Sequence, residues 1–208
     1  MHPNATFRSN DPARTTEVAR ARGFGLLTVN DDPVPLISHI PFLMSEDGGT
    51  AHLHLVRSNP IARKLKNGAL PARIAASGPD GYVSPDWYGV ADQVPTWNYV
   101  AVHLTGRLSL LPDSELCDII DAQSAHFERM LAPKPEWTSA KMTPEVLARM
   151  MRQIVPCRFD VAEADATRKL NQNKPDEVRL RAADAMEATG IGQETAALAR
   201  LMREAVEA

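Results

Sequence analysis

The sequence predicts an α+β protein built around a closed β-barrel, with flanking helices and a helical C-terminal tail. Six β segments follow one another with no long helix between them, which favours a barrel. Helical patterns lie before and after these segments, and residues 175–208 are rich in alanine and charge. The length of 208 residues suits one main core, so we expect a domain over residues 1–174 and an appendage over residues 175–208.

The first element is a helix between Asp11 and Gly23. Asp11 can cap its N-terminus, Pro12 suits its first turn, and Gly23 suits its end. The pattern then changes to alternating apolar and polar residues that are separated by turn residues. Three antiparallel strands are expected, over residues 24–29, 34–44 and 51–57.

The second half of the barrel is expected from residue 72 onward. Two short strands and one long alternating strand are predicted over residues 72–77, 81–84 and 98–111. Apolar residues at helical spacing predict a helix over 113–131, and Thr143-Pro144 opens another that runs to Val155. Residues 157–164 then read as a returning strand.

Composition excludes several classes of protein. No apolar run approaches the roughly 20 residues that span a bilayer, and the first residues lack the apolar stretch of a signal peptide, so we expect a cytoplasmic protein. The formal net charge of −3 does not support direct nucleic-acid binding. Cys117 and Cys157 show no metal-binding or disulfide spacing, so we expect both to be reduced and unpaired.

Residues 56–68 place a strand end, a helix cap and a basic turn in direct succession. Asn59 can cap a short helix that starts at Pro60. The amide hydrogens of a helix N-terminus attract anions, and Arg63 and Lys64 add positive charge, so the segment is a candidate phosphate cradle. Charge runs are usually solvated, however, and a plain basic surface helix stays an alternative.

Aromatic residues gather in two segments, although they make up only 5% of the chain. Residues 82–89 and 94–106 hold all three tyrosines and two of the three tryptophans. One interpretation is a wall for a planar ring system, with Asn98 hydrogen-bonding the edge of a heterocycle. A dimer interface explains the cluster equally well, and we expect a homodimer because so many large side chains would otherwise be exposed.

The histidines do not form a metal-binding motif. Four of them fall in strand segments, and His52 and His54 share one strand face, but no third ligand is evident. We therefore expect no metal. The sequence also lacks the motifs of serine hydrolases, P-loop proteins and dinucleotide-binding folds.

Five motifs, in order, resemble the PaiB-type family of FMN-binding negative transcriptional regulators. They are SHIPFLM (38–44), HLVRSNP (54–60), YVSPDWY (82–88), VPTWNYVAVHLTG (94–106) and KLNQNKPDE (169–177). The resemblance implies a split β-barrel related to pyridoxamine 5′-phosphate oxidases and flavin reductases. It also implies a homodimer with two FMN sites across the interface.

The resemblance implies a cofactor site made of four parts: a strand beside the flavin ring, a phosphate-binding turn, an aromatic strand of the neighbouring subunit, and a late loop. In that order the residues are Ser38, His39 and Ile40; Asn59, Arg63 and Lys64; Trp97, Asn98 and Tyr99; and Gln172 and Asn173.

Two functions follow from the resemblance. The first is a regulatory role in which bound FMN alters an interaction. The alternative is a flavin-dependent oxidoreductase acting on a small molecule, since the cofactor brings its own redox chemistry. A haem-binding barrel is a third and more distant hypothesis, because no haem-directed motif is present. Whether the protein is an enzyme stays open at this point.

Overall fold

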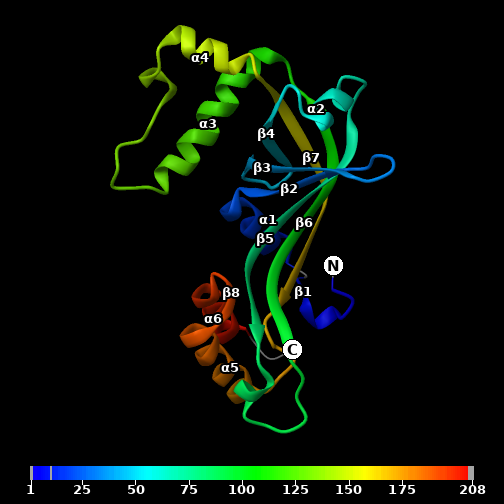
Figure 1. The fold of residues 1–208 in the computed structure, drawn as a ribbon, viewed down its shortest axis with the longest axis vertical. Coiled ribbons are helices and arrows are strands. Elements are labelled where there is room, and N and C mark those ends of the chain that lie inside the picture. The colour runs from blue at the N-terminus through cyan, green and yellow to red at the C-terminus, as the bar shows by residue number, and fades with distance from the viewer. Residues whose placement is uncertain (1, 10, 206–208) are drawn as a thin grey trace. The chain divides into compact units, whose positions relative to one another are not determined.

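The structure, a computed structural model, describes residues 2–9 and 11–205 (Figure 1). The chain divides into two compact units. We call the one formed by Ala19–Ala76 and Leu104–Ala164 the barrel unit, and the one formed by Met1–Val18, Ser77–His103 and Asp165–Ala208 the helix-covered unit. The expected border at residue 175 stays a prediction; residues 1, 10 and 206–208 lie outside the described part of the chain.

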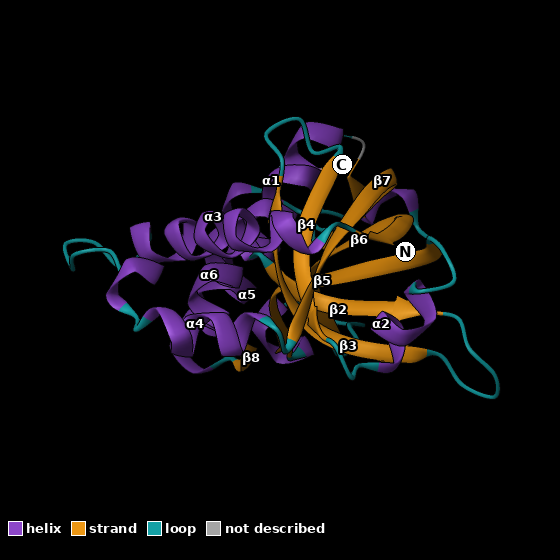
Figure 2. Ribbon diagram, turned by 90° about the horizontal axis from the view of Figure 1, so that it is seen from above, coloured by secondary structure: helices purple, strands orange, loops and turns teal. Residues whose placement is uncertain are grey.

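The strands of the barrel close into a ring. Along the sheet the neighbour order is β7-β4-β3-β2-β5-β6, and β6 pairs again with β7. The six strands are β2 (Phe24–Val29), β3 (Leu36–Met44), β4 (Thr50–Val56), β5 (Leu70–Val83), β6 (Thr96–Leu110) and β7 (Ile154–Lys169). The last three contribute residues to both units. This antiparallel ring with flanking and C-terminal helices confirms the predicted split β-barrel of α+β class (Figure 2).

Strand alternation fills the barrel interior. Every second residue of a strand points to the same face, so the inward set of each strand is apolar. Leu27, Phe42, Leu53, Ile74 and Phe159 are all fully buried there. These side chains form the core that holds the ring together by apolar burial.

One glycine permits the ring to close. A Cβ at Gly106 of β6 would lie 2.0 Å from the carbonyl oxygen of Asp160 on β7. No side chain can occupy that position, so β6 and β7 approach closely only because residue 106 is glycine.

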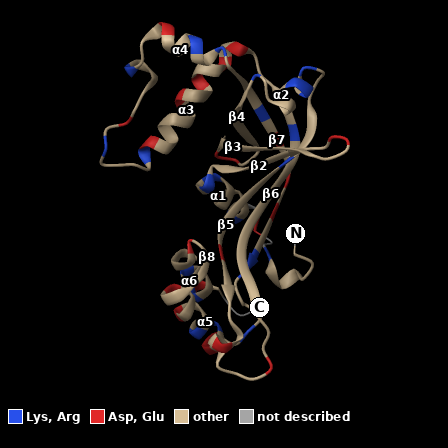
Figure 3. Ribbon diagram, viewed as in Figure 1, with Lys and Arg blue, Asp and Glu red and all other residues tan. Residues whose placement is uncertain are grey.

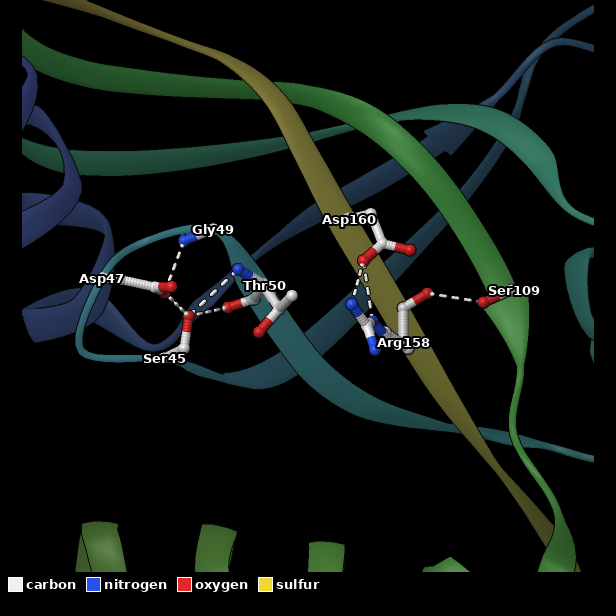
Figure 4. A network of polar contacts seen from close by, with 7 residues as sticks. All are labelled: Ser45, Asp47, Gly49, Thr50, Ser109, Arg158 and Asp160. Atoms are coloured by element: carbon white, nitrogen blue, oxygen red, sulfur yellow. Dashed lines mark hydrogen bonds and ion pairs between the residues drawn. The ribbon is translucent and has the colours of Figure 1, made fainter.

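Polar contacts fix the turn between β3 and β4 (Figure 4). Ser45 donates a hydrogen bond to Asp47 at 2.6 Å and accepts one from the amide of Thr50 at 3.0 Å. Asp47 also accepts from the amide of Gly49, and these hydrogen bonds hold the pKa of the Asp47 carboxyl below its usual value. The predicted turn over these residues is thereby confirmed.

Four helices frame the strands: α1 (Pro12–Arg22), α2 (Pro60–Leu65), α3 (Leu116–Arg129) and α4 (Pro144–Met151). Two 3₁₀ turns, η3 (Asp113–Glu115) and η4 (Ser139–Lys141), accompany the last two helices. Asp11 caps α1 as predicted, since its carboxylate accepts from the amide of Ala13 at 3.0 Å. Helix α3 packs on β3 and β4 and buries Leu116, Ile119 and Gln123.

The helix-covered unit contains the C-terminal ends of β5 and β7 and the N-terminal end of β6. Its other elements are η1 (Ala5–Phe7), β1 (Arg8–Ser9), η2 (Pro85–Tyr88), α5 (Asp176–Thr189), β8 (Ile191–Gln193) and α6 (Thr195–Glu204). Strand β1 pairs with β7, and β8 pairs with β5. Helices α5 and α6 pack against these strand ends and form a buried core with them. Val83, Val100 and Met186 belong to this core.

Candidate functional site

Outward side chains of the barrel unit line up in two rows across β3, β2 and β5. In one row Thr28 lies opposite Ile37 and Arg73, and in the other Leu26 lies opposite His39 and Ala75. Residues directly opposite one another in an antiparallel sheet share one face. We call the surface formed by Leu26, Thr28, Ile37, His39, Arg73 and Ala75 the barrel face.

Large apolar side chains are exposed on and beside the barrel face. Ile37 is 59% exposed, and Phe24, the next outward residue of β2 beyond Leu26, is 52% exposed. The imidazole ring of His39 stacks on Phe24 with ring centroids 6.3 Å apart. Exposed apolar patches of this kind mark surfaces that bind a ligand or a partner.

A cavity of about 390 Å³ opens beside Thr28 and Arg73, which together with Thr105 of β6 we call the polar row. It is lined by Thr28, Asn30, Pro71, Ala72, Arg73, Ala75 and Thr105. Arg73 Nε donates a hydrogen bond to Thr105 Oγ1 at 3.1 Å. The volume is in the range of small-molecule pockets, roughly 300–1,000 Å³.

Asn59 joins the start of α2 to β3. Its Oδ1 accepts from the amide of Ile61 at 2.8 Å, so it caps the helix as predicted. Its Nδ2 donates to Ser38 Oγ at 2.7 Å. The structure thereby brings together two residues that the sequence resemblance assigned to the site from separate motifs.

The two predicted phosphate-binding cations lie in the last turn of α2 and not at its N-terminus. Lys64 Nζ lies 2.5 Å from Asp31 Oδ1, and this ion pair holds the pKa of the Asp31 carboxyl below its usual value. Arg63 is exposed and has no side-chain partner among the described residues. Figure 3 shows the basic residues on α2. Of the two cations, Arg63 is the one whose charge is not already paired.

The three predicted residues of β3 do not share one face. Ile40 is 1% exposed and belongs to the barrel core, and Ser38 points to the same side of the strand. His39 alone points outward onto the barrel face. Because side chains alternate along a strand, Ile40 can offer a ligand only its backbone groups.

The predicted residues of β6 alternate in the same way. Trp97 is 44% exposed, its Nε1 donates to Asp80 at 3.1 Å, and its ring meets Tyr82 edge to face. Tyr99 is half-buried on the same side. Asn98 is fully buried on the opposite side, where its Nδ2 lies 3.6 Å from the thioether of Met202 and its Oδ1 has no hydrogen-bond partner among the described residues.

Of the two residues that were expected to close over the cofactor, Gln172 holds the late loop in place through hydrogen bonds. The Gln172 side chain accepts from the amide of Leu170 and donates to the carbonyl oxygens of Thr6 and Arg168. Asn173 is exposed. Buried Asn171, at φ +62°, donates to the Tyr88 hydroxyl at 3.2 Å. Gln172 therefore has a structural role in the helix-covered unit.

Sequence reasoning missed the polar row. Thr28, Arg73 and Thr105 come from three separate strands. Thr28 and Arg73 lie outside the motifs of the resemblance, and Thr105, which lies within the motif of residues 94–106, was given no role by it. One signal was available: Arg73 is the single charged residue in the alternating run 72–77. A lone arginine on the outward side of such a strand is a candidate ligand-binding residue.

No group of three or more potential ligands within the described residues could hold a metal ion. His54 lies against α3, and burial lowers the pKa of its imidazole below the usual value. The two cysteines are unpaired; Cys117 is exposed on α3, whereas Cys157 is buried in the barrel, where burial raises the pKa of its thiol to about 12. None of the described helices is long and apolar enough to cross a membrane.

Comparison of the sequence with known families and proteins gives two matches that agree. Residues 1–163 match a family described as "Putative FMN-binding domain". The Bacillus subtilis protein "Protease synthase and sporulation protein PAI 2" is 26% identical over 170 residues, which is 81% of this chain and 80% of that protein.

Solved structures share the fold at low sequence identity. The FAD and haem binding protein from Mycobacterium smegmatis superposes with a TM-score of 0.58 at 16% identity, over 89% of this chain and 81% of that one. A protein titled as a 5-nitroimidazole antibiotic resistance protein from Bacteroides thetaiotaomicron gives 0.55 at 13% identity, over 80% and 92%. Fold, ordered motifs and sequence match lead to one conclusion: the chain belongs to the PaiB-type family of FMN-binding split barrels.

Proposed function

We propose that the protein binds FMN on the barrel face and acts as a flavin-dependent regulatory protein. One observation carries the binding proposal: a half-buried apolar row, Leu26 and Ala75 with exposed Phe24 beside it, lies on the same unit as arginines that have no carboxylate partner among the described residues. The apolar row suits the flavin ring, and the cations suit its phosphate. Arg63 and Arg73 are these arginines.

The chain's own residues would bind and shield the cofactor. Leu26 and Ala75 exclude water from one side of a ring laid across them, and His39 with Phe24 borders that ring. Arg63 and Lys64 attract the phosphate, and Asn59 holds their helix to β3 through Ser38. When bound, FMN supplies hydride and one-electron transfer chemistry.

A dimer completes the proposal. In the helix-covered unit Trp97 and Ile191 are exposed, with Tyr82 between them as the ring neighbour of one and the strand partner of the other. A second copy would cover these side chains. Sedimentation is expected to give a dimer at micromolar concentration, and a stable monomer would contradict this part.

The regulatory role rests on the family resemblance, and the B. subtilis relative is named as a sporulation protein. The alternative, a flavin-dependent oxidoreductase, is favoured by the cavity beside the apolar row, because it leaves room for a small substrate. Steady consumption of a nicotinamide reductant by the FMN-loaded protein would favour the enzyme. A change in partner binding on photoreduction of the flavin, with no turnover, would favour the regulator.

Calorimetry with FMN and riboflavin tests the phosphate end of the site. Replacing Arg63 and Lys64 together with alanine should weaken FMN binding by about 2–5 kcal/mol, since each charged hydrogen bond is worth roughly 1.5–3 kcal/mol. Riboflavin lacks the phosphate, so its binding should change little. The matched control is Lys66→Ala with Arg107→Ala, which removes the same charge elsewhere on the barrel unit.

Two results would count against the proposal. Equal affinity of the unmodified protein for FMN and riboflavin would show that no phosphate site exists at α2. A visible spectrum of the purified protein with a haem Soret band, in place of the flavin bands, would replace FMN by the third hypothesis.

A further inference from the structure

We infer that the cavity at Arg73 is an oxyanion-binding site, made for a carboxylate or phosphate group and distinct from the cations of α2. Arg73 lies on the outward side of β5, and Thr28 is its cross-strand partner on β2. Both residues line the cavity of about 390 Å³, together with Thr105 of β6. Three neighbouring strands thus place one guanidinium and two hydroxyl groups around one cavity.

The guanidinium of Arg73 is oriented before any ligand arrives. Its Nε donates to Thr105 Oγ1 at 3.1 Å, which fixes one edge of the planar group against β6. Its terminal nitrogens make no hydrogen bond or ion pair with the described residues. An arginine held in this way presents paired donors that match the two oxygens of a carboxylate or phosphate.

Two other arginines of the barrel unit are neutralised by carboxylates, whereas no described carboxylate neutralises Arg73. Arg57 pairs with Asp113 at 3.2 Å, and Arg158 pairs with Asp160 at 2.7 Å. Arg73 has no carboxylate partner among the described residues, and no acidic residue lines its cavity. An arginine without a carboxylate partner attracts anions, and no carboxylate in the cavity lining competes with an incoming anion for its guanidinium group.

The nearest acidic residue in sequence to the cavity lining is already neutralised. Asn30 belongs to the lining, and Asp31 follows it, but Lys64 holds the Asp31 carboxylate at 2.5 Å. Asp31 therefore contributes little negative potential to the cavity. The same ion pair reduces the positive charge that Lys64 offers to an anion, whereas Arg73 has no carboxylate partner among the described residues.

The rest of the lining suits a small acidic group. Pro71 and Ala75 offer apolar contact, and Thr28 can donate a hydrogen bond to an oxygen of the ligand. The cavity volume suits a compact molecule or one end of a larger one. Two sources carry the right group: the phosphate of FMN itself, and the acidic group of a second molecule that lies beside the flavin.

Thermal unfolding of the full-length, flavin-free protein tests the site with inorganic phosphate and acetate as probes. Either anion should raise the unfolding midpoint of the wild type, because a ligand that binds only the folded state stabilises it. Arg73→Gln should abolish the shift. Arg107→Gln is the matched control, since Arg107 is exposed on β6 and donates to the carbonyl of Ala69 outside the cavity lining; it should retain the full shift. An equal shift in Arg73→Gln and the wild type would overturn the inference.

Two further variants test whether the orientation of Arg73 by Thr105, and not only its charge, contributes to anion binding. Arg73→Lys keeps the charge but cannot form the same fork, so it should restore only part of the anion shift. Thr105→Val removes the acceptor that orients Nε and should weaken anion binding by about threefold to tenfold. A full shift in Thr105→Val together with a full shift in Arg73→Lys would overturn the oriented geometry.

Flavin titrations identify the source of the anion. If the FMN phosphate occupies the cavity, Arg73→Gln should lose about tenfold or more in FMN affinity while riboflavin binding is unchanged. If a second acid occupies it, both flavins should bind Arg73→Gln as they bind the wild type, with the phosphate and acetate shifts still lost. The flavin-free experiment can be read even if the wild type binds no FMN, so failure of the proposed function and failure of this site are distinguishable.

Discussion

The barrel face and the strand surface covered by α5 and α6 differ in how far their apolar side chains are exposed to solvent. Ile37 on the barrel face and Phe24 beside it are more than half exposed, and Arg73 has no carboxylate partner among the described residues. Beneath α5 and α6 the apolar residues are sealed, and even the polar Asn98 is fully buried with an unpartnered oxygen. The first surface therefore has the exposed apolar side chains that are typical of a binding surface. The second is covered by α5 and α6, and the burial of Asn98 there without a partner for its oxygen is destabilising.

The largest effect should come from the sealed surface. Met186 of α5 is fully buried, and Met186→Ala should lower the free energy of unfolding by about 2–5 kcal/mol. Phe24→Ala on the open side should cost less than about 1 kcal/mol, because its side chain is already half in water. Urea denaturation measures both. Equal losses would remove the contrast between the two surfaces.

Asn98 offers a change in the opposite direction. Asn98→Leu removes an unsatisfied amide from an apolar cluster and should stabilise the protein by about 1–3 kcal/mol. Asn98→Asp, which buries a charge at the same place, should destabilise it. Denaturation followed by FMN titration separates stability from binding: a stabilised Asn98→Leu with lower FMN affinity would show that Asn98 reaches the flavin. Loss of stability in Asn98→Leu would refute our account of its burial.

A pH titration tests the effect of burial on His54 in the barrel unit. Burial lowers the pKa of His54, so the unfolded chain takes up a proton more readily than the folded one. The contribution of His54 to stability is therefore complete above its ordinary pKa of 6.5 and falls as the pH drops below that value. The slope is at most about 1.4 kcal/mol per pH unit. His54→Gln should flatten the slope near pH 6, and an unchanged slope in this variant would refute the assignment to His54.

The smallest effect concerns the ion pair beside the barrel face. Asp31→Asn frees Lys64 to bind an anion, so FMN affinity should rise by about twofold to fivefold, and the rise should shrink at high salt. Riboflavin affinity should stay constant in the same calorimetric titration. A fall in FMN affinity would mean that Asp31 orients Lys64 and does not compete with the phosphate.

The barrel itself could be predicted from the sequence, because alternation, caps and turns are local signals. Residues 77–81 show where such signals mislead. Gly78-Pro79-Asp80 separates the two strands predicted over residues 72–77 and 81–84, yet β5 runs through these three residues without a break. A Cβ at Gly78 would meet Val100 at 3.0 Å, and one at Gly81 would meet Met186 at 2.8 Å. These glycines serve close packing, which depends on partners distant in sequence.

The candidate site was predictable only in part, for a related reason. Motif resemblance assigned runs such as Ser38–Ile40 and Trp97–Tyr99 as units, but a strand sends adjacent side chains to opposite faces. The contact from Asn59 to Ser38 joins two of the motifs. Arg73 and its neighbours on the polar row gather only through the strand register, which no single segment specifies.

The order of synthesis gives the buried core beneath α5 and α6 a further consequence. Every residue of the barrel unit precedes α5 in the chain, so a ribosome delivers the whole ring first, and domains fold as they emerge. Val83 and Val100 therefore stay exposed to solvent until α5 and α6 are synthesised and Met186 and Met202 can pack against them. During that interval the nascent chain exposes the apolar end of a strand. Deleting α5 and α6 would make that transient exposure permanent.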